Sequence, residues 1–276
     1  MNNLSVGIIG LGSFGRFIAD ICPSGVKVLG FDERLVYRPE NVTYASFDEV
    51  AQCDIVFLAI PLGTYTAVLS RVKKVLRKET LIVDICSVKT TPGYLLRQFL
   101  PDHKNLLVTH PLFGPQSAAK STKGHKLIVT SSSGERAEQV IRFCEEKLEL
   151  DVERMSDEQH DRAMATIHAL TFFIARSLKE IHIPRETLMT PSYQVLLDLA
   201  DLDRAHSQEL FLTIEKGNPY SKQIYSEFVK EVQKLEKELN SKPNFDAEVT
   251  KEKTTNKEAR VKSSKLAFLR TKRDSV

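Results

Sequence analysis

The sequence predicts an α/β fold, in which a doubly wound and mostly parallel sheet is followed by an all-α domain. Two observations predict the sheet. Apolar runs alternate with helical patterns up to about residue 150, and some runs, such as residues 55–60, are apolar at every position. Such strands suit a parallel sheet that is covered on both faces. The all-α domain is predicted because the strand-like runs stop near residue 155, whereas helical periodicity continues.

The first half contains six strand-like runs and four helical patterns. Strands are expected at residues 4–9, 26–31, 54–60, 80–85, 105–109 and 126–130, and helices at 16–21, 64–77, 92–99 and 135–149. In the second half, Ser156 and Gln159 have the spacing of a capping box, which predicts a long helix to about residue 181. Helices at 193–202, 208–215 and 220–239 follow. The expected domains are a sheet domain at 1–153, a helical domain at 154–240 and a charged, disordered tail at 241–276.

A glycine-rich turn follows the first strand. Gly10, Gly12 and Gly15 form the pattern G-x-G-x-x-G between an apolar run and a helical pattern. The first glycine allows a tight turn, the second lets a pyrophosphate approach the backbone, and the third lets the helix pack closely on the strand. Asp32 ends the second strand, where a carboxylate accepts a hydrogen bond from a ribose 2′-hydroxyl and repels a 2′-phosphate. The pattern predicts a Rossmann-type domain that binds NAD, with a purely structural βαβ unit as the alternative.

The residues expected to bind the dinucleotide lie at the ends of three strands. Arg34 is close enough to Asp32 in sequence that some tolerance of NADP is expected. The expected set is Gly10, Leu11, Gly12, Ser13, Phe14, Gly15, Asp32, Arg34, Ile60 and Pro61.

Charge and cysteine usage exclude several classes of protein. The net charge of +3 is uneven, because residues 241–276 carry +5 and the remainder carries −2. The predicted domains are therefore not basic, and a nucleic-acid partner is not expected. No apolar run is long enough for a transmembrane helix, and the first strand begins too early for a signal peptide. The four cysteines are widely spaced, so neither a disulfide framework nor a metal site is expected, and a cytoplasmic location is the simplest interpretation.

Polar residues follow the strands at 80–85 and 105–109, where ligands bind in an open parallel sheet. His110 is the leading catalytic candidate, because a neutral imidazole takes a proton from a hydroxyl as a hydride leaves the same carbon. Ser87 is expected to orient His110 or the hydroxyl, with a turn or helix cap as the alternative. Lys89 is expected to be solvated. His160 is interpreted as a contact between the domains rather than a catalyst.

These segments together resemble the prephenate and arogenate dehydrogenases of tyrosine biosynthesis. The similar segments are residues 10–15 (GLGSFG), 84–89 (DICSVK), 110–115 (HPLFGP) and 160–161 (HD), and the likeness runs from about residue 4 to 240. The resemblance implies an NAD-dependent oxidative decarboxylation of a cyclohexadienyl substrate and a helical domain that forms a homodimer. No membrane partner is expected, because no apolar run reaches transmembrane length. It also implies that His110 accepts the proton of the substrate hydroxyl and that Ser87 orients both groups.

The chain departs from the family pattern on the substrate side. Gln116 stands where family members often have an acidic residue, and Gln194 stands where prephenate-using members often have an arginine. A histidine usual in the long helix falls near Phe172, with His168 one turn earlier. The expected substrate-binding residues are Gly114, Gln116, Ser117, His168 and Gln194. Because glutamine cannot replace a bidentate arginine, Arg176, Arg185 or Arg204 is expected to substitute, or else the substrate differs.

Three functional hypotheses follow. The first is an NAD-dependent prephenate dehydrogenase, with arogenate or an amino-substituted prephenate as the alternative substrate. The second is a different NAD enzyme on the same fold, such as an imine or hydroxyacid dehydrogenase. The third is a non-catalytic protein that binds NAD.

Overall fold

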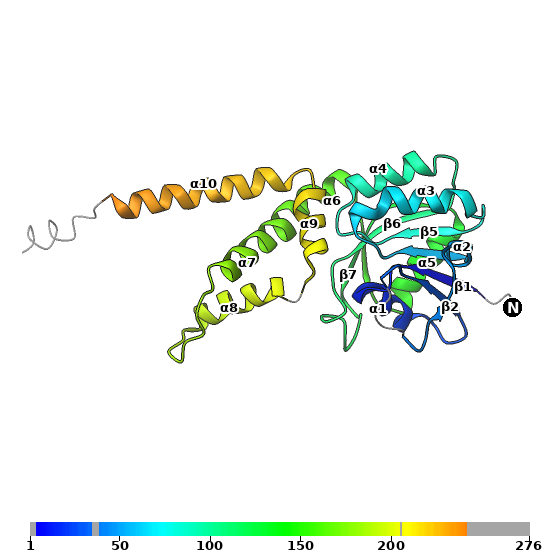
Figure 1. Ribbon diagram of the computed structural model, residues 1–276, viewed down its shortest axis with the longest axis horizontal. Helices are drawn as coiled ribbons and strands as arrows, with labels where there is room; N and C mark the ends of the chain where they lie inside the picture. Colours follow the sequence, from blue (N-terminus) through cyan, green and yellow to red (C-terminus); the bar gives the residue numbers. More distant parts are fainter. Residues whose placement is uncertain (1–3, 35–38, 205, 242–276) are drawn as a thin grey trace, which may run out of the picture. The chain divides into compact units, whose positions relative to one another are not determined.

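A computed structural model describes residues 4–34, 39–204 and 206–241 of the chain. Its centre is one eight-stranded sheet with the order β3-β2-β1-β4-β5-β6-β7-β8 (Figure 1). The strands are β1 (Ser5–Ile9), β2 (Lys27–Phe31), β3 (Thr43–Tyr44), β4 (Ile55–Leu58), β5 (Leu81–Asp84), β6 (Leu106–Pro111), β7 (Lys126–Ser133) and β8 (Asp151–Arg154). Only β6 and β7 pair in antiparallel fashion, so the prediction of a mostly parallel sheet is confirmed.

Helices cover both faces of the sheet. One face packs against α2 (Phe47–Ala51), α3 (Tyr65–Val75) and α4 (Thr90–Phe99), and the other against α1 (Ser13–Ile21) and α5 (Glu135–Glu146). A short 3-10 helix, η1 (Leu62–Thr64), precedes α3.

The sequence of strand β4 is apolar at every position because helices cover both of its faces. Val56 and Leu58 belong to the core on the α3 side, whereas Ile55 and Phe57 pack into the core on the α1 side. Because successive side chains of a strand point to opposite faces, a strand covered on both faces needs apolar residues at every position.

The second half is helical, as predicted. It contains α6 (Asp157–Met164), a π-helical turn η2 (Ala165–Leu170), α7 (Thr171–Glu180), α8 (Pro191–Arg204), α9 (Gln208–Gly217) and α10 (Ser221–Asn240). Ser156 and Gln159 form the predicted capping box at the start of α6. The expected single long helix is therefore three consecutive segments with a wide turn in the middle.

Three short elements were absent from the sequence prediction. Strand β3 has only two residues, and β8 pairs at the sheet edge with a polar sequence that is largely exposed, so neither contains an apolar run. Helix α2 has five residues and is marked by a capping box between Ser46 and Glu49.

Contacts divide the chain into a compact unit of residues 1–225 and a second unit of residues 226–276. The predicted boundary at 153/154 stays a prediction, since the sheet and the helices up to Tyr225 belong to one unit. The predicted disordered tail lies outside the described residues, except for Ser241. Within the described ranges, no helix is both long and apolar enough to cross a membrane.

Candidate active site

The glycine-rich turn between β1 and α1 has the geometry that a dinucleotide needs. Gly10 has φ +97°, a left-handed conformation that favours glycine, and a Cβ there would lie 2.3 Å from the carbonyl oxygen of Ala59. A Cβ on Gly15 would lie 2.0 Å from the carbonyl oxygen of Gly10. Gly12 faces open space, because a Cβ there would meet nothing within 4 Å. The turn therefore leaves room for a phosphate at the N-terminus of α1.

Asp32 follows β2 and is held by the backbone. Its carboxylate accepts hydrogen bonds from Leu11 N at 2.7 Å and from Arg34 N at 2.8 Å. The first bond ties the end of β2 to the glycine-rich turn, so the acidic group lies at the same edge of the sheet as Gly10. Arg34 forms an exposed ion pair with Glu209 of α9 at 3.6 Å. The structure thus brings most of the predicted cofactor residues together, and Ile60 lies beside Gly10.

His110 lies near the end of β6 in a buried chain of hydrogen bonds. Its Nδ1 is 2.8 Å from His160 Nε2, and His160 Nδ1 is 2.8 Å from Asp161 Oδ1. His160 and Asp161 are fully buried, and His110 is only 4% exposed. His160 is therefore a direct partner of the predicted catalytic residue, and its interpretation as a contact between domains missed this role.

The start of α4 holds the carboxylate of Asp161. Lys89 N donates to Oδ1 and Thr90 N donates to Oδ2, each at 2.8 Å. The side chain of Asn218 donates to the backbone oxygen of Asp161 at 2.7 Å. Burial opposes ionisation of Asp161, but the hydrogen bonds from His160, Thr90 and Lys89 outweigh it and lower the pKa of the carboxyl below its ordinary value.

Lys89 is not solvated, so that expectation is wrong. Its ammonium group is fully buried, contacts the carboxylate of Asp84 and donates to the backbone oxygen of Thr109. Asp84 also accepts a hydrogen bond from the hydroxyl of Tyr65 and one from Cys86 N at 3.2 Å. The sequence contained a signal for this pair, because Asp84 ends an otherwise apolar strand and a buried carboxylate needs a cation.

Other aromatic rings pack against His110. The His168 ring stacks on it with centroids 5.7 Å apart, and Phe172 and His206 continue the series beyond His168. Burial, followed by repulsion from His168, His160 and Lys89, lowers the pKa of His110 well below its ordinary value. Burial, with smaller effects of His206 and His160, lowers the pKa of His168 to about 4. A neutral imidazole at His110 is the form that accepts a proton.

Ser87 is half-buried, and its hydroxyl makes no hydrogen bond with another described residue. His110 Nδ1 is bonded to His160 instead, so the predicted orientation of His110 by Ser87 stays a prediction. Gly114 and Ser117 bond to each other in the loop after β6, and Gln116 is exposed there.

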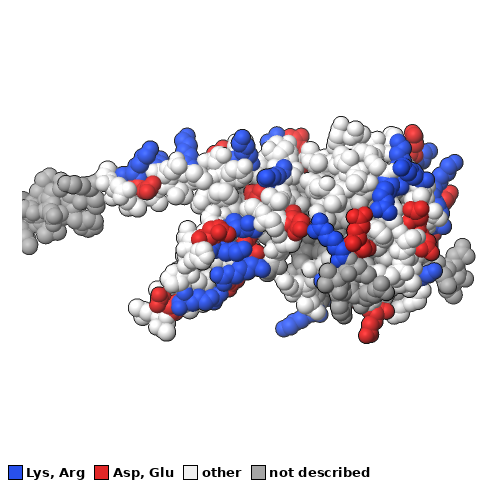
Figure 2. All heavy atoms as spheres, viewed as in Figure 1, with Lys and Arg blue, Asp and Glu red and all other residues white. Residues whose placement is uncertain are grey.

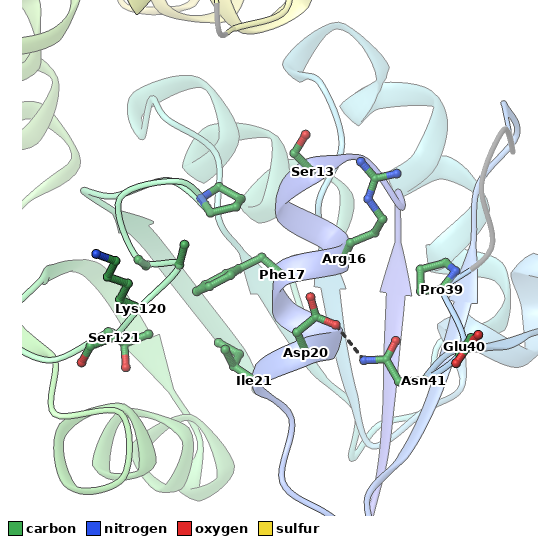
Figure 3. Close-up of a pocket in the computed structure, with 14 residues that line it drawn as sticks. Ser13, Arg16, Phe17, Asp20, Ile21, Pro39, Glu40, Asn41, Lys120 and Ser121 are labelled. Carbon is green, nitrogen blue, oxygen red and sulfur yellow. Dashed lines mark hydrogen bonds between the residues drawn. The ribbon is translucent and has the colours of Figure 1, made fainter.

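A cavity of about 960 Å³ lies along α1 rather than at His110. Phe17 of α1 faces the loop that contains Lys120 and Ser121, and Asp20 bonds Asn41 on the other side of the helix (Figure 3). The cavity includes Ser13 and so borders the glycine-rich turn. Phe113 packs on Phe14 and Phe17 with ring centroids 6.2 and 6.1 Å apart, so the loop after His110 lies next to α1.

Figure 2 shows basic and acidic side chains interspersed over the face in view. Among the residues that the structure describes, no group of three or more histidine, cysteine, aspartate or glutamate side chains is arranged to hold a metal ion.

Known proteins resemble this chain in sequence and in fold. Residues 33–149 match the family described as "Prephenate dehydrogenase, nucleotide-binding domain". Arogenate dehydrogenase 1 of Arabidopsis thaliana is 30% identical over 90% of this chain and 42% of its own length. Cyclohexadienyl dehydrogenase of Zymomonas mobilis is 28% identical over 63% of this chain and 65% of its own length.

This similarity supports assignment of the chain to the prephenate and arogenate dehydrogenase family. It spans between 42% and 65% of the length of the curated relatives that it matches. Prephenate dehydrogenase from A. aeolicus, crystallised with hydroxyphenyl propionate and NAD⁺, has a TM-score of 0.63 at 20% identity, covering 97% of this chain and 99% of that one. Arogenate dehydrogenase from Synechocystis has a TM-score of 0.59 at 18% identity, covering 94% and 100%. Both share the fold.

The arginines expected to replace the family's substrate-binding arginine all have carboxylate partners. Arg176 pairs with Asp203, and both Arg185 and Arg204 pair with Asp201. Gln194 donates to Asp198 on its own helix at 2.7 Å. Of the predicted substrate-binding residues, the structure therefore brings only His168 into contact with His110, and the roles of the others stay predictions.

Proposed function

We propose that the protein catalyses the NAD-dependent oxidative decarboxylation of prephenate to 4-hydroxyphenylpyruvate. One observation supports this above others: a buried, neutral imidazole, His110, lies at the edge of the sheet where the glycine-rich turn and Asp32 also lie. A base in that place accepts a proton from a hydroxyl that is held next to a dinucleotide. The similarity to this family supports the same reaction.

The described residues fit NAD. Gly12 leaves the backbone open where a pyrophosphate would lie, and the N-terminus of α1 favours its negative charge. Asp32 favours a free ribose 2′-hydroxyl and repels a 2′-phosphate. When bound, the nicotinamide ring accepts the hydride from the substrate. The A. aeolicus relative was crystallised with NAD⁺, which supports this choice of cofactor.

His110 is the base in this proposal. It takes the proton of the ring hydroxyl while a hydride leaves the same carbon, and the loss of CO₂ then produces an aromatic ring. His110 returns the proton to the phenolate oxygen, so the step releases no net proton. Aromatisation makes the reaction effectively irreversible. Ser87 is expected to hold the hydroxyl against His110.

Arogenate or an amino-substituted prephenate is the second candidate substrate. The observation that favours it is the pairing of Arg176, Arg185 and Arg204 with carboxylates, which leaves none of the three as an unpaired partner for a substrate carboxylate. A substrate side chain that carries an ammonium group as well as a carboxylate depends less on a dedicated arginine.

The test is reduction of NAD⁺, followed by absorbance, with prephenate and separately with arogenate. Activity with either supports the family reaction and identifies the side chain that is accepted. His110→Asn is expected to lower turnover by about 100-fold or more while binding of NAD⁺, measured by titration calorimetry, is retained. Binding of NAD⁺ without activity on either substrate would contradict the proposal and favour a non-catalytic role.

We also expect a homodimer through the helical part and a cytoplasmic location. Large apolar side chains are exposed there, including Ile167, Ile181 and Val195, each more than 60% exposed. The four cysteines are free thiols, which suits a reducing compartment. Light scattering after gel filtration measures the mass in solution, and a monomer at micromolar concentration would contradict the expected dimer.

A further inference from the structure

The chain of hydrogen bonds that ends on His110 has a direction, and the start of α4 determines it. The carboxylate of Asp161 accepts from Lys89 N and Thr90 N, and an ionised carboxylate has no proton to donate. The proton of the bond between Asp161 and His160 therefore belongs to His160 Nδ1, 2.8 Å away.

A neutral imidazole has one N–H group and one unprotonated nitrogen. With its proton on Nδ1, His160 has an acceptor at Nε2, and the 2.8 Å hydrogen bond to His110 must be donated by His110 Nδ1. The free lone pair of His110 is then on Nε2. Among the described residues, Nε2 of His110 has no hydrogen-bond partner, so it is the ring nitrogen available to a substrate.

We propose that His160 and Asp161 are positioning residues that hold His110 in the Nδ1–H tautomer, so that its Nε2 accepts the proton of the substrate hydroxyl. The role in the reaction rests on the function proposed above, whereas the tautomer does not. Once Nε2 of His110 has taken that proton, Nε2 of His160 accepts the hydrogen bond from Nδ1 of the charged His110 ring. The negative charge of Asp161, on the far side of His160, stabilises the positive charge on His110.

The reverse arrangement requires an additional proton in the cluster. If His160 carried protons on both nitrogens, it would donate to His110 Nδ1, and the proton of His110 would move to Nε2, which would then be a donor. The ionisable groups around the cluster are Lys89 and Asp84 from the β5–α4 segment, Tyr65 from α3, His168 from η2 and His206 before α9. Lys89 and Asp84 neutralise each other, and burial disfavours further positive charge.

The first experiment measures the tautomer directly in the full-length protein labelled with ¹⁵N-histidine. Long-range proton–nitrogen correlation spectra at neutral pH distinguish the two neutral tautomers, and His110→Gln identifies the signals of His110. We expect His110 protonated at Nδ1 in the wild type and a shift of its proton to Nε2 in His160→Phe. His103→Phe is the matched control, because His103 bonds the backbone oxygen of Thr80 and does not contact the cluster. An Nε2–H tautomer in the wild type would overturn the proposal, with or without dehydrogenase activity.

The second experiment measures kinetics, provided that the wild type is active. His160→Phe keeps a ring in the cavity but supplies no acceptor, and we expect kcat to fall about 100-fold with KM within twofold. His160→Gln offers an oxygen near the position of Nε2, and we expect its kcat to be at least tenfold higher than that of His160→Phe. If His160→Phe does not fold, the NMR spectrum of His160→Gln tests the proposal instead. His110 must keep its proton on Nδ1 in that variant. Wild-type kcat and pH profile in His160→Phe would contradict the positioning role, whereas an inactive wild type would contradict only the proposed function.

Discussion

Removing the buried ammonium group of Lys89 is expected to destabilise the fold strongly. Lys89→Met keeps the length of the side chain but leaves the carboxylate of Asp84 without its cation and the backbone oxygen of Thr109 without this donor. Both side chains of the ion pair are fully buried. Breaking a buried pair by removing one partner costs about 3–5 kcal/mol. Tyr65 and Cys86 continue to donate to Asp84, so we expect a value near the lower end, about 3 kcal/mol.

Urea unfolding followed by circular dichroism measures this loss, with the midpoint and slope analysed together. A loss of about 3 kcal/mol corresponds to a decrease in Tm of about 6–12 °C for a domain of this size. The matched control is the double variant Lys89→Met with Asp84→Asn, which removes both charges and retains an acceptor for Tyr65. We expect the double variant to recover at least half of the loss. A cost below about 1 kcal/mol for the single variant, or a double variant no more stable than it, would refute the reasoning.

Three further predictions follow from the cofactor site and from α9. Gly15→Ala places a Cβ 2.0 Å from the carbonyl oxygen of Gly10, so the turn must shift, and we expect affinity for NAD⁺ in titration calorimetry to fall about tenfold or more. Asp32→Ser removes the repulsion of a 2′-phosphate, and the ratio of NADP⁺ to NAD⁺ affinity should rise about tenfold; an unchanged ratio would contradict the role of Asp32. Burial raises the pKa of Glu215 from 4.5 to about 7, and neither carboxylate oxygen has a described partner. The folded state therefore holds this proton more tightly than the unfolded state, and stability should fall by about 1 kcal/mol as the pH rises from 4.5 to 7. Glu215→Gln should remove that fall in urea titrations at the two pH values.

The sequence predicted the sheet well because its central strands are buried on both faces. Residues 55–58 and 81–83 must be apolar at every position to fill two cores, and such runs are visible without any knowledge of the fold. The edge strand β8 has no such requirement, since one side of it lacks a neighbouring strand and its sequence is polar. It was missed for that reason.

The candidate site was predicted only in part, and the difference lies in how far apart its residues are in the chain. The glycine-rich turn and Asp32 form a local pattern with a fixed spacing, so they were found. His110 and His160 are 50 residues apart, and no local pattern indicates that their rings meet. The two hydrogen bonds that hold the carboxylate of Asp161 are even harder to predict from the sequence. Their donors are backbone N–H groups, which any residue type except proline could supply at positions 89 and 90.

The apolar residues of the predicted long helix, from Met164 to Ile174, form no single stripe along it, and the π-helical turn η2 explains why. An α-helix advances 100° per residue, and a π turn accommodates one more residue per turn than an α turn does. The buried residues of α7 are therefore offset around the helix axis from those of α6. As a result, the apolar residues do not recur with one helical period through both segments. Deleting one residue between Ala165 and Leu170 would restore a regular helix and rotate α7 by about 100° relative to α6. The length of this one turn thus sets which residues of α7 face α8, so deletion of a single residue there would turn a different side of α7 toward α8.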